Sequence, residues 1–273
     1  MIIQKTIENM GNLFDETFPE EIFDIETRSV KGAYIFRGEP SDSNSLITSY
    51  GRNYGTHYQI EERLLINFHK YGQFIDNKLT KSTIWEQLIF AQHHGLPTRL
   101  LDWTFSPLIA LHFAVNIKTR DDKIEDSVIW GLNISEINDT LPIKYRSALD
   151  KTKGTLFTLE LIKQLAKDLE EYDYDMANQS FIALEPPSLD ERIINQYALF
   201  TLLPKGIPSM EDYIRKSSTI HALKIIVPKE IQWELRSMLD RININERVLF
   251  PGLDGLSQWL KRYYHFLYRK GDI

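Results

Sequence analysis

Residues 92–107 run Gln-His-His-Gly-Leu-Pro-Thr-Arg-Leu-Leu-Asp-Trp-Thr-Phe-Ser-Pro, the densest group of chemically different polar side chains in the sequence. Gly95 suits the end of a preceding helix, because glycine accepts the left-handed backbone often found there. The next residues, Thr98–Thr104, have the length and flanks of a strand or an extended loop. Ser106 before Pro107 predicts a helix N-cap with proline in the first turn. The stretch therefore predicts helix, strand and helix in direct succession.

The segments around this stretch mix both kinds of secondary structure. Apolar residues recur at helical spacing from Gln59 to Phe74 and from Ser82 to Gly95, and residues 108–117 predict a nearly all-apolar helix in the core. Because helices and strands do not alternate regularly, the pattern favours an α+β fold over a parallel α/β sheet. We expect further helices at 6–25, with an interruption near Pro19, and at 159–171, 230–241 and 256–268, and strands at 33–38, 128–132, 181–184, 197–203, 221–227 and 247–250.

The composition is that of an ordinary globular protein. The chain has 273 residues, 42% of them hydrophobic and 26% charged, which is enough for a large core. It has no cysteine, so disulfides, thiolate zinc sites and thiol nucleophiles are excluded, and we expect no metal site. The net charge of −6 supplies no general attraction for nucleic acid or an anionic membrane. Since no stretch reads as a membrane span or a secretory signal, we expect a cytoplasmic protein without a membrane partner.

The polar groups of residues 92–107 have two interpretations. So many different groups between apolar helices are typical of a ligand site. Alternatively, Arg99 and Asp102 form a buried ion pair that braces the fold, while His93 and His94 end a helix in water and Trp103 belongs to the core. In either case we expect Arg99 and Asp102 to be buried partners, because they stand three residues apart in an otherwise apolar segment.

Several segments together resemble the FRG domain, a bacterial family. The resemblance rests on Phe36-Arg37-Gly38, on residues 91–104 and 106–114, on Arg192–Gln196 with Phe200, and on residues 249–256. It covers roughly Tyr34 to Leu260, and the chain departs from the family at Gly252, where Asp is usual, and at Ala198, where Gly is usual. We expect one FRG unit over 31–273, preceded by a helical extension over 1–30.

The chain also resembles ADP-ribosyltransferases, in a less specific way. These enzymes present an Arg-Gly or His-Gly pair at the end of a first strand, a Ser/Thr-rich strand that leads into a helix, and a Glu beside a late strand. Here Arg37-Gly38, then Thr104 and Ser106 before residues 110–114, then Glu246 before 248–250, follow in the same order. The resemblance implies a mixed or antiparallel sheet flanked by helices, and NAD as the substrate.

The same resemblance implies a role for each of these residues. Arg37 and Gly38 would contact a phosphate or ribose of NAD, Thr104 and Ser106 the nicotinamide ribose, and Glu246 would be the catalytic carboxylate. Breaking the nicotinamide–ribose bond builds positive charge on the sugar, so a carboxylate beside it acts mainly in the transition state. Asp254 is the nearest rival to Glu246. From the dense stretch we add Gln92, His93, Thr98 and Arg99 to the expected NAD site and His94 to the expected catalytic groups.

The expected function is therefore an enzyme that binds NAD and transfers ADP-ribose to an acceptor or to water. The acceptor stays open between protein, nucleic acid and a small molecule, and a toxin or phage-defence role would be consistent with such an enzyme. A non-catalytic module that binds a nucleotide, nucleic acid or protein through the same pocket is the main alternative. A nuclease that uses His93 and His94 as acid and base is a further one.

Overall fold

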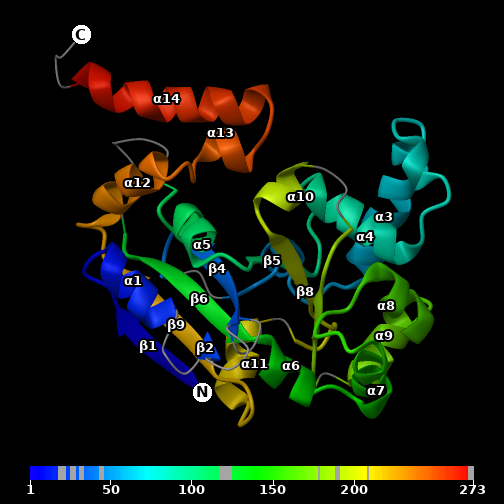
Figure 1. Cartoon of the computed structure of the whole chain (residues 1–273). Helices are drawn as coiled ribbons and strands as arrows, with labels where there is room; N and C mark the ends of the chain where they lie inside the picture. Colours follow the sequence, from blue (N-terminus) through cyan, green and yellow to red (C-terminus); the bar gives the residue numbers. More distant parts are fainter. Residues whose placement is uncertain are drawn as a thin grey trace.

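The computed structural model describes residues 1–17, 23–24, 29–30, 34–42, 46–116, 125–177, 179–187, 191–207 and 209–269 (Figure 1). Its centre is a seven-stranded sheet in the order β1-β9-β6-β4-β5-β8-β7. Strands β1 and β9 are parallel, and every other neighbouring pair in this sheet is antiparallel. The strands of the sheet are β1 (Ile2–Thr6), β4 (Tyr34–Glu39), β5 (Leu100–Thr104), β6 (Ser127–Asn133), β7 (Ile182–Leu184), β8 (Ala198–Leu202) and β9 (Ala222–Val227); β2 (Phe23–Asp24) and β3 (Ser29–Val30) pair separately.

Helices connect and cover these strands. The α+β prediction is confirmed, with the sheet mixed rather than purely antiparallel. The α-helices are α1 (Met10–Thr17), α2 (Ser49–Tyr54), α3 (Gln59–Gly72), α4 (Ile84–His93), α5 (Pro107–Ala114), α6 (Ile134–Asp139), α7 (Ile143–Thr152), α8 (Leu159–Leu165), α9 (Leu169–Met176), α10 (Glu191–Asn195), α11 (Met210–Lys216), α12 (Gln232–Arg241), α13 (Glu246–Leu249) and α14 (Leu253–Arg269), and a 3-10 turn, η2, spans Asn77–Leu79.

The central strands are covered on both faces. Side chains alternate along a strand, so Ile35 and Trp130 face one apolar cluster while Phe36 and Ile129 face another. The first cluster includes residues of α6 and α11, and the second includes residues of α1, α5 and α12. A third cluster joins β7 and β8 to α4, α7, α8 and α9, which gather beside β8 in Figure 1.

Gly38 allows α5 to lie directly on β4. A Cβ atom at this position would come within 1.8 Å of the Ala110 carbonyl oxygen and 2.6 Å of the Ala114 amide nitrogen. Both atoms belong to the helix backbone, so the contact cannot be relieved by a change of rotamer. Glycine is therefore required here by close packing, and the contact brings the middle and the end of α5 next to the strand residue Gly38, which follows Arg37.

The local sequence patterns predict most of these elements correctly. The helices expected at 59–74, 82–95, 230–241 and 256–268 correspond to α3, α4, α12 and α14, and the apolar helix after Ser106 is α5. Ser106 caps α5 as expected, because its side chain accepts a hydrogen bond from the Ile109 amide. The strands expected at 33–38, 98–104, 128–132, 181–184, 197–203 and 221–227 correspond to β4, β5, β6, β7, β8 and β9, although Ala33 is outside the described residues.

Three local predictions are wrong. Of the helix expected over 6–25 only α1 is present, since residue 6 ends β1 and residues 23–24 form β2; the predicted interruption near Pro19 falls in residues 18–22, which, like residue 25, lie outside the described part of the chain. The helix expected over 159–171 divides into α8 and α9, because Ala166 has an extended backbone. The strand expected over 247–250 is the short helix α13, in which the Asn245 side chain accepts a hydrogen bond from the Val248 amide. Its inward residues, Glu246 and Leu249, are three apart, which is helical spacing.

The division into an extension over 1–30 and a unit over 31–273 stays a prediction. Within 1–30, β1 pairs with β9 along five residues and so takes part in the main sheet. Among helices of the described residues, none combines the length and apolar character needed to cross a bilayer.

Candidate functional site

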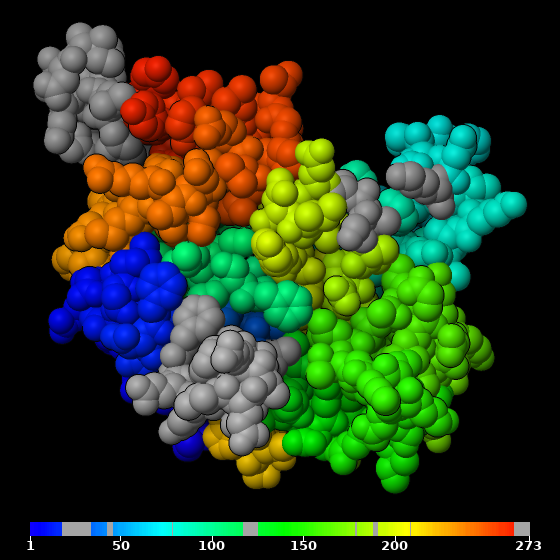
Figure 2. Space-filling model, viewed as in Figure 1, coloured from blue at the N-terminus to red at the C-terminus, as the bar shows by residue number. Residues whose placement is uncertain are grey.

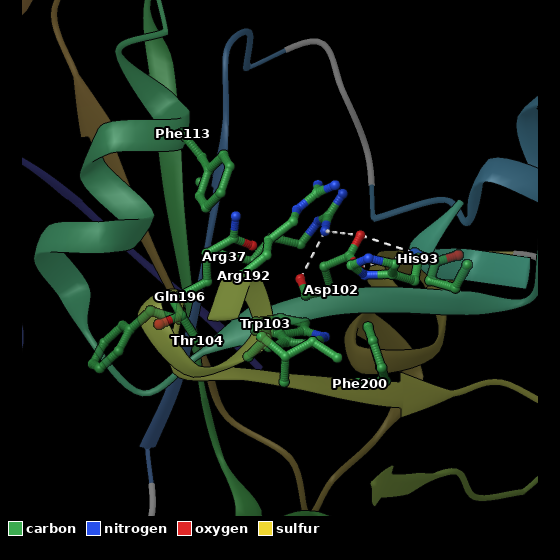
Figure 3. Close-up of a pocket in the computed structure, with 14 residues that line it drawn as sticks. Arg37, His93, Asp102, Trp103, Thr104, Phe113, Arg192, Gln196 and Phe200 are labelled. Atoms are coloured by element: carbon green, nitrogen blue, oxygen red, sulfur yellow. Dashed lines mark hydrogen bonds and ion pairs between the residues drawn. The ribbon is translucent and has the colours of Figure 1, made fainter. Parts of the chain in front are cut away.

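A pocket of about 200 Å³ lies where β4, β5 and β8 meet α4, α5 and α10 (Figure 3). It joins segments that are far apart in the sequence, since β4 is in the first fifth of the chain and α10 is in the last third. Its lining includes Phe36, Arg37, Gly38, Gln92, His93, Asp102, Trp103, Thr104, Phe113, Arg192, Ile193, Gln196, Ala198 and Phe200.

Arg37 is held in a fixed orientation at one side of this pocket. Its Nε donates to Glu39 Oε1 at 2.6 Å, and its Nη1 donates to the backbone oxygen of Asp102 at 2.7 Å. The Asp102 carboxylate is also close, with Oδ2 3.7 Å from Nη1 (dashed in Figure 3). Only 14% of the Arg37 side chain is exposed. A guanidinium held by protein acceptors loses little side-chain entropy when it binds a ligand.

The carboxylate of Asp102 is oriented from the opposite side by an amide. Gln92 Nε2 lies 3.0 Å from each Asp102 carboxylate oxygen, and Gln92 Oε1 accepts a hydrogen bond from the Thr98 hydroxyl at 2.5 Å. Thr98 is fully buried, so the hydroxyl that fixes the amide has no access to solvent. The Asp102 side chain itself is 58% exposed. The network therefore presents an oriented carboxylate to the pocket.

Aromatic side chains and a second guanidinium complete the lining. Trp103 is anchored by a hydrogen bond from its indole nitrogen to the Thr201 hydroxyl at 2.9 Å. Arg192 lies over the Phe250 ring, with its guanidinium carbon 5.0 Å from the ring centroid. Among the described lining residues there are thus two guanidinium groups and one carboxylate. Glu39 and Asp102 offset the charge of Arg37, but the directed N–H donors of the two guanidinium groups suit an anionic ligand, and the aromatic rings favour a ligand with planar groups.

A wider groove of about 640 Å³ adjoins this pocket. It shares His93 and Arg192 with the pocket, and its other lining residues come from α10, the α13–α14 corner and the start of α14. In Figure 2, α10 (yellow) adjoins the orange and red surface of α13 and α14. We call the first cavity the inner pocket and the second the outer groove. The outer groove is lined by His93, Glu191, Arg192, Phe250, Pro251, Gly252, Asp254 and Gln258.

The structure brings many of the predicted site residues together. Of the residues predicted from sequence, Arg37, Gly38, Gln92, His93 and Thr104 line the inner pocket. Thr98 supports the site through Gln92, and Ser106 caps α5 beside it. His94 follows α4 as its C-cap and is not among the lining residues of either cavity. The His93 and His94 rings are nearly perpendicular, at 85°.

The predicted pairing of Arg99 with Asp102 is wrong. Arg99 donates to Glu61 and to Asp173, while Asp102 contacts Gln92 and Arg37. The reason is the alternation of an extended chain, in which residues three apart point to opposite sides. Arg99 is therefore buried behind the strand, and Asp102 faces the inner pocket.

Glu246 lies in a buried cluster of ion pairs rather than in the lining of either cavity. Its carboxylate is 2.7 Å from Arg236 Nη2 and 2.8 Å from Arg262 Nε, and Arg262 also pairs with Asp240 at 2.7 Å. Burial opposes ionisation of this carboxylate, but Arg262 and Arg236 outweigh it and lower the pKa of Glu246 to about 2. The structure thus keeps Glu246 ionised and surrounded by protein cations.

His112 lies beside the same cluster and predicts a pH dependence of stability. Burial, and then the charge of Arg236, lower the pKa of His112 to about 3 from 6.5, and its Nδ1 accepts a hydrogen bond from Arg236. Below the ordinary pKa, the unfolded chain binds a proton at this residue and the folded chain does not. Between pH 6.5 and about pH 3, acidification therefore lowers the free energy of unfolding by up to about 1.4 kcal/mol per pH unit.

We expect His112→Gln to reduce this slope by an amount that grows to about one proton as the pH falls from about 7 to about 5. Urea unfolding at several pH values measures the slope, and His57→Gln, at an exposed histidine, is the matched control. If the parent and His112→Gln have parallel stability profiles, His112 is not buried in its neutral form.

Several residues of the inner pocket escape prediction from residue pattern alone. Arg192, Gln196 and Phe200 had a signal only in the resemblance to the FRG family, and Phe113 reads simply as part of an apolar helix. Asp102 is singled out by the sequence but with the wrong partner. Among the described residues, no three His, Asp or Glu side chains gather in a way that could hold a metal ion.

Comparison with known families supports one part of this picture. Residues 32–123 match the family model of the FRG domain, so the predicted resemblance is confirmed over that segment. The matched segment runs from before β4 to beyond α5 and includes Arg37, Gln92 and Asp102, whereas Arg192 and Gln196 lie outside it. No curated protein and no solved structure matches the chain.

Proposed function

We propose that the inner pocket binds NAD and that the protein cleaves its nicotinamide–ribose bond, with transfer of ADP-ribose to an acceptor or to water. The observation that carries this proposal is the junction of two guanidinium groups, an oriented carboxylate and aromatic side chains in one pocket. The predicted similarity to ADP-ribosyltransferases supports the choice of NAD among anionic ligands with planar rings.

The guanidinium groups suit the pyrophosphate. Arg37 has its Nε and Nη1 committed to protein acceptors, and its Nη2 carries two further N–H donors. Arg192 adds a second planar cation from another element. Two guanidinium groups supply charge and directed donors to a diphosphate, which a single exposed lysine would not.

Asp102 is the carboxylate of this proposal. When the bond between ribose C1′ and the nicotinamide nitrogen breaks, its electron pair leaves with neutral nicotinamide, and positive charge grows on the ribose. An ionised carboxylate beside the ring stabilises that charge until an acceptor oxygen or nitrogen attacks C1′ and loses its proton. Asp102 takes this role in place of Glu246, because it lines the pocket and is held by Gln92, whereas Glu246 is neutralised by two buried arginines.

The test is the release of nicotinamide from NAD by Asp102→Asn. Because the carboxylate acts mainly in the transition state, we expect kcat to fall by about 10²–10³-fold with little change in KM. Asp150→Asn, at an exposed position of α7, is the matched control and should keep parental turnover. Full activity in Asp102→Asn would remove Asp102 from the reaction.

Two observations favour the alternative of a binding module. Gln196, an uncharged amide two residues before β8, lines the pocket, and Arg37 partly offsets the charge of Asp102 at 3.7 Å. Calorimetry with ADP-ribose separates the two functions. If the parent binds ADP-ribose, if Arg37→Ala abolishes that binding, and if the parent releases no nicotinamide with water or with any acceptor tried, the module binds the nucleotide without catalysis.

A further inference from the structure

We propose that the outer groove holds the adenosine half of the dinucleotide, while the inner pocket holds its nicotinamide riboside half and Arg192 contacts the pyrophosphate between them. This inference rests on the proposed function and assigns a ligand group to a second cavity.

The sizes and continuity of the two cavities support this division. NAD consists of two nucleosides joined by a pyrophosphate, so it needs two neighbouring compartments with a positive charge where they meet. The inner pocket, at about 200 Å³, is below the usual range for a whole ligand of this size, whereas the outer groove has about 640 Å³. The two cavities share His93 and Arg192, so a cation lies at their junction.

Arg192 lies exposed at this junction and rests on the Phe250 ring. Its guanidinium lies over the Phe250 ring, which leaves its N–H groups directed outward along the guanidinium plane. Asn195 Nδ2 donates to the Val248 carbonyl at 2.8 Å, and Gln196 Nε2 donates to the Leu249 carbonyl at 2.9 Å. These bonds attach the end of α10 to α13, and α10 contributes to the walls of both cavities.

The walls of the outer groove have the groups that an adenosine needs. Phe250 and Pro251 offer apolar surface to a planar base. Asp254 and Gln258 are four residues apart on α14 and so share one helical face. A carboxylate accepts hydrogen bonds from ribose hydroxyls, and an amide can both donate to and accept from the edge of adenine.

The carboxylates also give the groove a preference among dinucleotides. Glu191 and Asp254 both line it, and a 2′-phosphate on the adenosine ribose would bring a further negative charge next to them. Acidic residues that accept from the 2′-hydroxyl select NAD over NADP in the same way elsewhere. We therefore expect the chain to bind NAD more tightly than NADP.

The experiment compares fragments of the dinucleotide by calorimetry. The ligands are AMP for the outer groove, nicotinamide mononucleotide for the inner pocket, and ADP-ribose. We expect Asp254→Asn to lower the affinity for AMP and for ADP-ribose at least tenfold, because a hydrogen bond to a charged group is lost. The affinity for nicotinamide mononucleotide should not change. Gln258→Ala should also lower the affinity for AMP and ADP-ribose. Ser257→Ala, at an exposed neighbouring position, is the control and should leave the affinities for all three ligands unchanged.

The outcomes that contradict the inference differ from those that contradict the proposed function. If nicotinamide mononucleotide binds and AMP affinity is the same in the parent, Asp254→Asn and Gln258→Ala, the groove does not hold adenosine although the function stands. If these variants lose ADP-ribose transfer to an acceptor while AMP affinity is unchanged, the groove belongs to the acceptor and the inference is again wrong. If neither mononucleotide nor ADP-ribose binds the parent, both proposals fail.

Discussion

Replacement of Glu246 by alanine is expected to destabilise the folded chain by about 3–5 kcal/mol, because two buried arginines would lose their shared counter-ion. Arg236 and Arg262 have side chains only 2% and 7% exposed, and the Glu246 carboxylate lies within 2.8 Å of both. Arg262 would keep Asp240, whereas Arg236 would be left without its carboxylate. Urea unfolding measures the loss, and Glu234→Ala, at an exposed position of α12, is the matched control.

The same measurement decides between two roles of Glu246. If Glu246→Ala unfolds at the parental urea concentration but loses nicotinamide release, the residue acts on the substrate as its place in the sequence predicts. If the free energy of unfolding falls, Glu246 has a structural role and stabilises the packing of α12, α13 and α14 through its ion pairs. Because the folded pKa of about 2 is below the ordinary value of 4.5, this contribution should be present above about pH 4.5 and be lost as the pH falls toward 2.

Replacement of Glu246 should also disturb the inner pocket, because α13 contacts the end of α10 and Gln196, which lines this pocket. Asn195 and Gln196 donate to carbonyl groups of α13, and Arg192 rests on Phe250, the residue after it. Under conditions where Glu246→Ala remains folded, we therefore expect weaker binding of ADP-ribose. A catalytic carboxylate would instead affect turnover more than affinity.

The contrast between Arg37 and Glu246 explains how much of the site can be predicted from sequence. Arg37 belongs to a short apolar segment before a glycine, and this local pattern correctly places it in a strand of the sheet, whereas the close contact of Gly38 with α5 was not predicted. The function of Glu246 depends on Arg236 and Arg262, which are 10 and 16 positions away along a chain that turns twice. Partners set by tertiary packing leave no periodic signal, and the local pattern also predicted a strand where the short helix α13 lies.

The same limit applies to the fold. Strands such as β6 are readable because a continuous apolar run that begins with the β-branched residues Val128 and Ile129 is typical of a strand buried on both faces. The parallel pairing of β1 with β9 joins residues more than 200 positions apart, and no local pattern identifies it. The short helix α13 has too few residues to show a period, and its Asn245 cap was the one available signal.

Arg99 provides the second large effect on stability. Its Nε donates to both oxygens of Glu61 at 2.8 and 2.9 Å, its Nη1 donates to Asp173 at 2.6 Å, and 4% of its side chain is exposed. Burial opposes its charge, but Glu61 and Asp173 raise the pKa of Arg99 above its usual value. Arg99 directly precedes β5, Glu61 belongs to α3 and Asp173 to α9, so the triad ties α3 and α9 to the sheet.

We expect Glu61→Gln to destabilise the chain by about 3–5 kcal/mol, because the buried guanidinium would keep only Asp173 as a counter-ion. Glu62→Gln, at the exposed neighbouring position, is the control. Urea unfolding of Glu61→Leu, Arg99→Met and the double variant forms a thermodynamic cycle. The double variant should be more stable than the sum of the single changes, since it leaves neither of these two charges unpaired. Additive losses would show that Glu61 and Arg99 do not act as a pair, and the ion-pair explanation of this contact would be wrong.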